Sequence, residues 1–141
     1  MPVVTKKIRF QTKGEVDIID ISKLVNKVIQ ETKLKDGNGI ATIFCPGATG
    51  AITTIEFEPG LLQDLPNTLE KIVPKNAYYK HHEMWHDGNG HSHVRASILG
   101  PSLTVPFSEK KLILGTWQQV VFVELDVRPR SREIIVQIIG E

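Results

Sequence analysis

All five histidines of this 141-residue chain fall within thirteen consecutive residues, at positions 81, 82, 86, 91 and 93. Neutral imidazole is a common metal ligand, and it also gains and loses protons near neutral pH. The alternative is a surface loop whose histidines are solvated or satisfied by hydrogen bonds. We favour a functional site, because an exposed loop has no need of this composition.

The last part of the cluster is expected to be a β-strand over residues 91–99. Side chains alternate between the two faces of a strand, so His91, His93 and Arg95 would share one face while Val94 turns toward the core. Two imidazoles would then lie beside a guanidinium group. This face is predicted to line a cavity.

The Asp-Gly-Asn-Gly turn at residues 87–90 is expected to fold this strand back beneath His81. A third imidazole would then join the other two. Three nitrogen ligands with an open fourth position are typical of a catalytic zinc site, although imidazole also suits iron, nickel and copper. We therefore predict a divalent metal ion, with zinc as the first choice, on His81, His91 and His93, and we assign His86 to solvent.

An acidic pair, Glu124 and Asp126, ends the apolar run that follows Trp117. By alternation both carboxylates would lie on the face that carries Phe122. A carboxylate near histidines completes a metal shell, orients an imidazole or acts as a general base. The plainer alternative is that both residues form ion pairs with nearby arginines.

Arginines alternate directly after this pair, and Arg130 and Arg132 present planar groups that suit a phosphate or carboxylate. A solvated, charged turn explains them equally well. The glycine-rich bend at residues 46–50 offers backbone N–H groups to an anion, although it lacks the lysine of a phosphate loop. Thr49, within this bend, is assigned with the two arginines to phosphate binding.

Hydrophobic periodicity indicates which elements would hold these residues. The predicted fold is α+β, a largely antiparallel β-sandwich or half-barrel with two main helical segments. The helices are expected over residues 20–33 and 59–73, and Pro66 should kink or divide the second. Strands are expected over residues 3–13, 40–45, 51–57, 91–99, 103–107, 112–114, 117–125 and 133–139.

Composition limits the classes of function. The chain has the length of a single domain, 1–141, and its formal net charge is +1, which gives no global attraction for nucleic acid or an anionic membrane. No apolar run suggests a signal peptide or a membrane helix, so a cytoplasmic protein is expected. Cys45, the only cysteine, lies in an apolar run and is predicted to be a buried, inert thiol.

Several short motifs together resemble the signature of the YjbQ family, small uncharacterised proteins credited with a secondary thiamine-phosphate synthase activity. The similarity extends along almost the whole chain, and Gly115-Thr116-Trp117-Gln118 is its most specific block. In that block we expect Trp117 to pack and Gln118 to bind backbone. The other motifs are Ser102–Pro106, Tyr79-Lys80-His81, Ser92–Ser97, Glu124-Leu125-Asp126 and Arg130-Ser131-Arg132.

The resemblance implies an α+β fold with a substantial β-sandwich, and a homotrimer. It also implies a site that contains His81 and His93. Five further side chains would surround them and bind or catalyse: Arg95, Glu124, Asp126, Arg130 and Arg132. Many members have His-Thr-Thr where this chain reads Gly47-Ala48-Thr49, and His91 or His82 is expected to replace that histidine.

Two functions follow as hypotheses. The first is an enzyme of phosphate-bearing small molecules, with catalytic His81, His93, Arg95, Glu124 and Asp126 acting on a substrate that loses pyrophosphate or phosphate. The second is a non-enzymatic trimer that binds a metal ion or ligand. A nucleic-acid module ranks third, because the net charge is small and aromatic residues are sparse.

Overall fold

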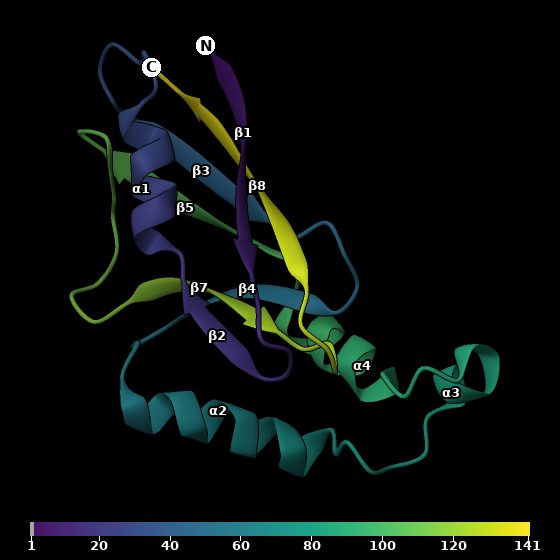
Figure 1. Cartoon of the computed structure of the whole chain (residues 1–141). Helices are drawn as coiled ribbons and strands as arrows, with labels where there is room; N and C mark the ends of the chain where they lie inside the picture. The colour runs from purple at the N-terminus through teal and green to yellow at the C-terminus, as the bar shows by residue number, and fades with distance from the viewer. Residues whose placement is uncertain (1) are drawn as a thin grey trace.

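Two antiparallel β-sheets form the body of the protein, shown in Figure 1 as a computed structural model that describes residues 2–141. The strands are β1 (Val3–Gln11), β2 (Asp17–Asp20), β3 (Gly39–Phe44), β4 (Gly50–Ile55), β5 (Ser102–Ser108), β6 (Lys111–Leu112), β7 (Gln119–Glu124) and β8 (Ser131–Gly140). One sheet has the order β1-β8-β3-β5-β6, and the other has the order β2-β7-β4. The antiparallel α+β class predicted from the sequence is confirmed.

Helices cover the sheets on different sides. They are α1 (Ser22–Gln30), α2 (Pro59–Ile72), α3 (Lys80–Trp85) and α4 (Gly90–Leu99). Figure 1 shows α1 against the five-stranded sheet and α2 alongside the three-stranded sheet, whereas α3 projects away from both. No helix within residues 2–141 combines the length and apolar character needed to span a membrane.

Strand β7 is the central strand of the three-stranded sheet, and both of its faces are covered. Val120 and Phe122 pack into the core that also receives α1, while Val121 and Val123 pack into a second core with α2 and α4. Burying such a side chain fully contributes roughly 1.5–3 kcal/mol. Because side chains alternate, Glu124 follows Phe122 on the same face and is carried into the interior.

The predicted strand over residues 91–99 is wrong, because this segment is helix α4. In a helix, each residue is rotated by about 100° from the one before it, so residues two positions apart point in nearly opposite directions. His91 and Arg95 therefore share a buried face, and His93 lies on another. Ala96 is buried as expected, but Val94 is 41 % exposed.

Other differences from the prediction are smaller. The second helix is continuous through Pro66, which does not divide it. Short elements β2 and α3 were not predicted. Trp117 is 71 % exposed and does not pack in the interior, whereas Gln118 accepts the expected backbone hydrogen bond, from the Gly115 N–H at 3.0 Å. Cys45 is buried, and burial raises the pKa of its thiol, as an inert cysteine requires.

Candidate functional site

The imidazole rings of His81 and His93 lie close together where α3 and α4 meet, with their planes tilted by 47°. Their ring centroids are 4.4 Å apart. The turn at residues 86–90 joins the two helices and allows this approach, with His86 and Gly88 in the left-handed backbone region. The pairing predicted for these two histidines is therefore found, although it arises between two helices and not along a strand.

Polar side chains surround the histidine pair. His81 Nε2 lies 3.4 Å from Asp87 Oδ1. In one orientation of its amide, Asn89 donates to Asp126 Oδ1 at 3.5 Å. In the other orientation it donates to Asp87 Oδ1 at 2.7 Å and to His81 Nε2 at 3.1 Å, and this second choice satisfies the amide better. In this orientation Asn89 joins His81 to Asp87 and no longer donates to Asp126.

The pKa of His93 is lowered from its ordinary value of 6.5. Partial burial of the ring is the main cause, and the nearby positive charge of protonated His81 adds to it. The carboxylates of Asp87 and Asp126 oppose the shift without cancelling it. His93 is therefore neutral at pH 7, and its imidazole is able to accept a proton.

Glu124 and Arg132 form a buried ion pair between the end of β7 and the start of β8. Arg132 donates from Nε to Glu124 Oε1 at 2.8 Å and from Nη2 to Oε2 at 2.5 Å. Glu124 also accepts from the Thr12 hydroxyl at 2.8 Å and from the Asp126 N–H at 3.1 Å. Burial would lower the pKa of Arg132, but Glu124 outweighs it and raises that pKa, so the guanidinium stays charged.

Asp126 and Arg130 form a second ion pair, nearer the surface. Arg130 Nη1 donates to Asp126 Oδ2 at 2.7 Å, and the Arg130 side chain is 35 % exposed. Thr49 connects the two pairs, since its hydroxyl donates to Asp126 at 3.1 Å and accepts from Arg132 Nη2 at 3.0 Å. Burial opposes ionisation of Asp126, but the Val127 N–H, Thr49 and Arg130 outweigh it and lower the pKa of Asp126.

The carboxylates and arginines therefore pair with each other, which was the plainer of the two interpretations of the sequence. Glu124 and Arg132 are buried. Their placement suits residues that hold the site together more than residues that touch a substrate. Arg130 differs, because it is part-exposed and retains N–H groups that Asp126 does not use.

Two hollows flank the histidine pair. One has a volume of about 260 Å³, and Asp87, Asn89, Asp126 and Arg130 line it. The other has a volume of about 190 Å³, and His93 and the bend that contains Gly47 line it. The part-exposed Arg130 guanidinium lies on the wall of the first hollow, together with the carboxylates of Asp87 and Asp126.

The structure does not bring His91 and Arg95 to this site. His91 Nε2 binds Glu15 Oε2 at 2.7 Å. Arg95 donates from Nε to the Val73 carbonyl at 3.0 Å and from Nη2 to Glu70 at 2.9 Å, so it ties α4 to the end of α2. The replacement of the family histidine at Gly47 by His91 is not seen either.

A resident metal ion does not fit the residues that are assembled here. Across residues 2–141, no three His, Cys, Asp or Glu side chains are arranged to hold a metal ion. A catalytic zinc site ordinarily has three protein ligands, and the His81–His93 pair supplies two.

Three residues of the site were not predicted. The sequence indicates only a turn at Asp87 and Asn89, and only a strand at Thr12. Asn and Asp are common in turns for backbone reasons alone, so their residue type gives no sign of a site. The position of the turn between two clusters of histidines was the one available signal.

Comparisons with known proteins give one consistent result. The family model described as "UPF0047 protein YjbQ-like" matches residues 6–141. A UPF0047 protein of Methanothermobacter thermautotrophicus is 40 % identical over 100 % of this chain and 95 % of its own length. The UPF0047 protein YugU of Bacillus subtilis is 32 % identical over 96 % of this chain and 98 % of its own length.

Solved structures agree with the sequence relatives. A YbjQ-like protein of unknown function from Sulfolobus solfataricus has a TM-score of 0.91 at 34 % identity and covers 99 % of both chains. An uncharacterised protein of the yjbq/upf0047 family from Clostridium acetobutylicum has a TM-score of 0.85 at 37 % identity, covering 95 % of this chain and 99 % of its own.

Proposed function

The chain belongs to the UPF0047 YjbQ-like family, and from that premise we propose that it is an enzyme of small phosphate-bearing molecules, with His81, His93 and Arg130 at its active site. The observation that carries the proposal is the contact between the two imidazoles at 4.4 Å, beside Asp87 and Asp126. A histidine whose pKa is lowered is a suitable general base at neutral pH.

Each residue has a distinct role in this proposal. Neutral His93 accepts a proton from the attacking group or from a bound water molecule. His81, close to Asp87, orients the substrate through its ring nitrogen. Arg130 donates to a phosphate oxygen and stabilises the negative charge that grows when phosphate or pyrophosphate departs. Asp126 holds Arg130 in place from the opposite side.

The first reaction that we put forward is the one that the family resemblance implies. Thiamine-phosphate synthesis joins a pyrimidine methyl diphosphate to a thiazole phosphate and expels pyrophosphate. The thiazole nitrogen forms the new bond to the pyrimidine methylene carbon, and the carbon–oxygen bond to pyrophosphate breaks. This nitrogen carries no proton, so the role of His93 as a base applies to hydrolysis and to transfer to a hydroxyl group, and not to this bond formation. Arg130 and the histidine pair would meet the expelled pyrophosphate. Other transfers or hydrolyses of phosphorylated molecules use the same groups.

Turnover tests the proposal. The purified protein is incubated with the pyrimidine diphosphate and thiazole phosphate, and then with other phosphorylated metabolites, while pyrophosphate and phosphate release are measured. His93→Gln should lower the rate of hydrolysis, or of transfer to a hydroxyl group, by about 10²–10⁴-fold, as loss of a general base does. The control is His86→Asn, since His86 is exposed and asparagine tolerates its left-handed backbone.

The control should retain the wild-type rate. Equal rates in wild type and His93→Gln would contradict the assignment of the base. Tight binding of a phosphorylated compound without turnover would instead favour a ligand-binding protein without enzymatic activity, the second of the two hypotheses.

We also propose that the protein is a homotrimer. Several large apolar side chains are exposed, and where such side chains gather into one patch they commonly mark a contact between chains. They include Ile72, Tyr78, Met84, Trp85, Ile98, Ile113 and Trp117. Burial of these residues against neighbouring copies would explain why helix α3, which has no buried residue, projects from the body (Figure 1).

A further inference from the structure

A separate hollow of about 400 Å³ lies on the other side of the α3–α4 junction. Its size falls within the range of pockets for small ligands, which begins at roughly 300 Å³. It is lined by Lys75, Asn76, Ala77, Tyr78, Tyr79, His82, Gly88, Gly90 and His91. It is separate from the site of the histidine pair, because neither His81 nor His93 lines it.

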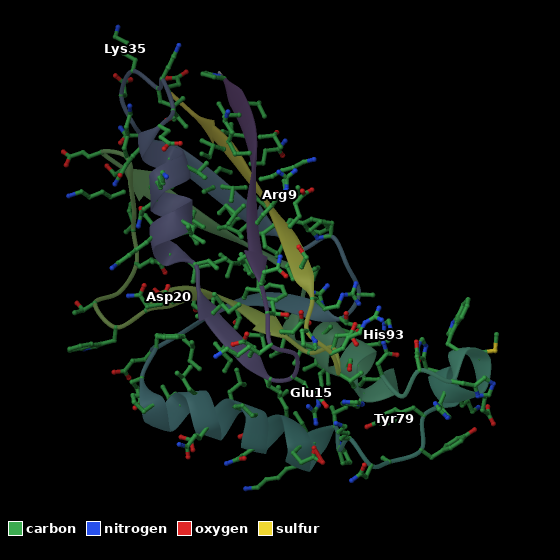
Figure 2. The ribbon with its side chains drawn as sticks, viewed as in Figure 1. Arg9, Glu15, Asp20, Lys35, Tyr79 and His93 are labelled. Atoms are coloured by element: carbon green, nitrogen blue, oxygen red, sulfur yellow. The ribbon has the colours of Figure 1, made fainter. Side chains whose placement is uncertain are left out.

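His91 is the buried polar group of this hollow. Its side chain is 1 % exposed, and its Nε2 lies 2.7 Å from Glu15 Oε2. The other carboxylate oxygen, Glu15 Oε1, pairs with Lys75 Nζ at 2.5 Å. Figure 2 shows Glu15 on the loop after β1, near Tyr79 and the start of α4. The three side chains form a chain of contacts from lysine to carboxylate to imidazole.

The contact with Glu15 determines which nitrogen of His91 faces a ligand. Burial opposes ionisation of Glu15, but hydrogen bonds and charge from Lys75 and His91 outweigh it and lower the pKa of Glu15. An ionised carboxylate only accepts hydrogen bonds, so His91 Nε2 carries the hydrogen. In neutral His91, Nδ1 is then a hydrogen-bond acceptor, and no side chain or backbone group of residues 2–141 donates to it.

The walls of the hollow are aromatic and closely fitted. Tyr78 and Tyr79 contribute rings, and the Tyr79 hydroxyl is already engaged with the Pro74 carbonyl. Gly90 is required next to Tyr79, since a Cβ at that position would lie 2.5 Å from Tyr79 Cβ. The Tyr79 ring centroid is 6.3 Å from that of His91, so a flat ring can lie against both.

We propose that this hollow is a second ligand site, which binds a planar aromatic acid carrying a hydroxyl group. The hydroxyl donates to Nδ1 of His91, the ring packs on Tyr78 and Tyr79, and the carboxylate faces Lys75, whose side chain is half exposed. The Glu15–His91 dyad makes the acceptor stronger, because the carboxylate stabilises positive charge on the imidazole. This site does not depend on the function proposed for His81 and His93.

The test uses 4-hydroxybenzoate as a probe and the whole protein labelled with ¹⁵N-histidine. Long-range proton–nitrogen NMR spectra report the protonation of each ring nitrogen. We expect His91 in the free protein to carry its hydrogen on Nε2, and we expect the Nδ1 resonance to move in a saturable way as the probe is added. The resonances of His81 and His93 should move much less.

A pair of matched variants locates the binding. Ala77→Trp fills the hollow from its rim and should lower the affinity for 4-hydroxybenzoate at least tenfold. Ala48→Trp makes the same change at an exposed alanine of a different hollow and should leave the affinity unchanged. Both alanines are exposed, so neither variant disturbs the core, whereas replacement of buried His91 would.

Three results would overturn the proposal. One is a hydrogen on Nδ1 of His91 in the free protein. Another is the absence of a saturable shift at His91 with millimolar probe. The third is equal probe affinity in wild type and Ala77→Trp.

Discussion

Replacement of Glu124 by glutamine tests whether the buried carboxylate holds the site together. Glu124 accepts four hydrogen bonds, from the Thr12 hydroxyl, the Asp126 N–H and two nitrogens of Arg132. A glutamine amide keeps one acceptor oxygen and places an NH₂ group where the other oxygen was. Two donors therefore lose their partner and face another donor, and the charge of Arg132 loses its counterion.

The magnitude follows from the contacts that are lost. A hydrogen bond to a charged group contributes about 1.5–3 kcal/mol, and breaking one partner of a buried ion pair costs about 3–5 kcal/mol in total. We expect Glu124→Gln to lower the free energy of unfolding by roughly that amount. For a chain of this size the midpoint of thermal unfolding should fall by about 10–15 °C.

Urea denaturation followed by circular dichroism measures the loss. The matched control is Glu133→Gln, which removes an exposed carboxylate that pairs with Arg9 at 2.7 Å. Solvent screens that pair, so the control should unfold close to the wild-type midpoint. A Glu124→Gln protein as stable as the control would refute the argument that Glu124 and Arg132 are structural.

Three further predictions follow. In an NMR titration, His93 should have a pKa below 6.5. His81→Gln removes a neighbouring positive charge and should raise the pKa of His93. Asp87→Asn removes an attractive negative charge and should lower the pKa of His93 further. A shift of the opposite sign in either variant would show that the groups named do not set the pKa. Arg95→Met should destabilise the fold by about 1–3 kcal/mol through loss of its buried hydrogen bonds, and should leave a phosphate ligand bound with unchanged affinity. Light scattering should give about three times the chain mass of 15.8 kDa; a mass of one chain at all working concentrations would exclude the trimer.

The sequence was sufficient for the parts of the fold in which one periodicity dominates. Alternation along residues 120–124 correctly placed Glu124 on the face of Phe122, since a central strand covered on both sides tolerates no slip in register. The helix predicted over residues 59–73 was also found, as α2. There the helix starts at Pro59, and the Glu58 side chain accepts from two backbone N–H groups as its cap.

Helix α4 could not be predicted in the same way. Its apolar residues at 94, 96 and 98 alternate as in a strand, and its N-cap Asn89 makes no side-chain capping bond. The small residues Ala96 and Ser92 are buried, and their size lets helix α4 pack closely against the rest of the protein. Because a strand was predicted here, His91 was expected beside His93 as the third metal ligand. In helix α4 it lines a different hollow.

The sequence allowed ion pairs between the carboxylates and the arginines, but it did not show which arginine would be buried. Arg130 and Arg132 are equivalent in the sequence, yet Arg132 is buried on Glu124 and Arg130 is part-exposed. The difference arises because β8 begins at Ser131, so that Arg132 lies within the sheet and Arg130 before it.

Titration of the protein with pyrophosphate, followed by NMR of the histidine and arginine side chains, tests the central claim most directly. Our account predicts that the resonances of His81, His93 and Arg130 move together and saturate. It also predicts that Arg130→Gln weakens binding at least tenfold while the His93 pKa stays below 6.5. Pyrophosphate that leaves these three side chains unmoved, or that binds Arg130→Gln as tightly as wild type, would contradict it.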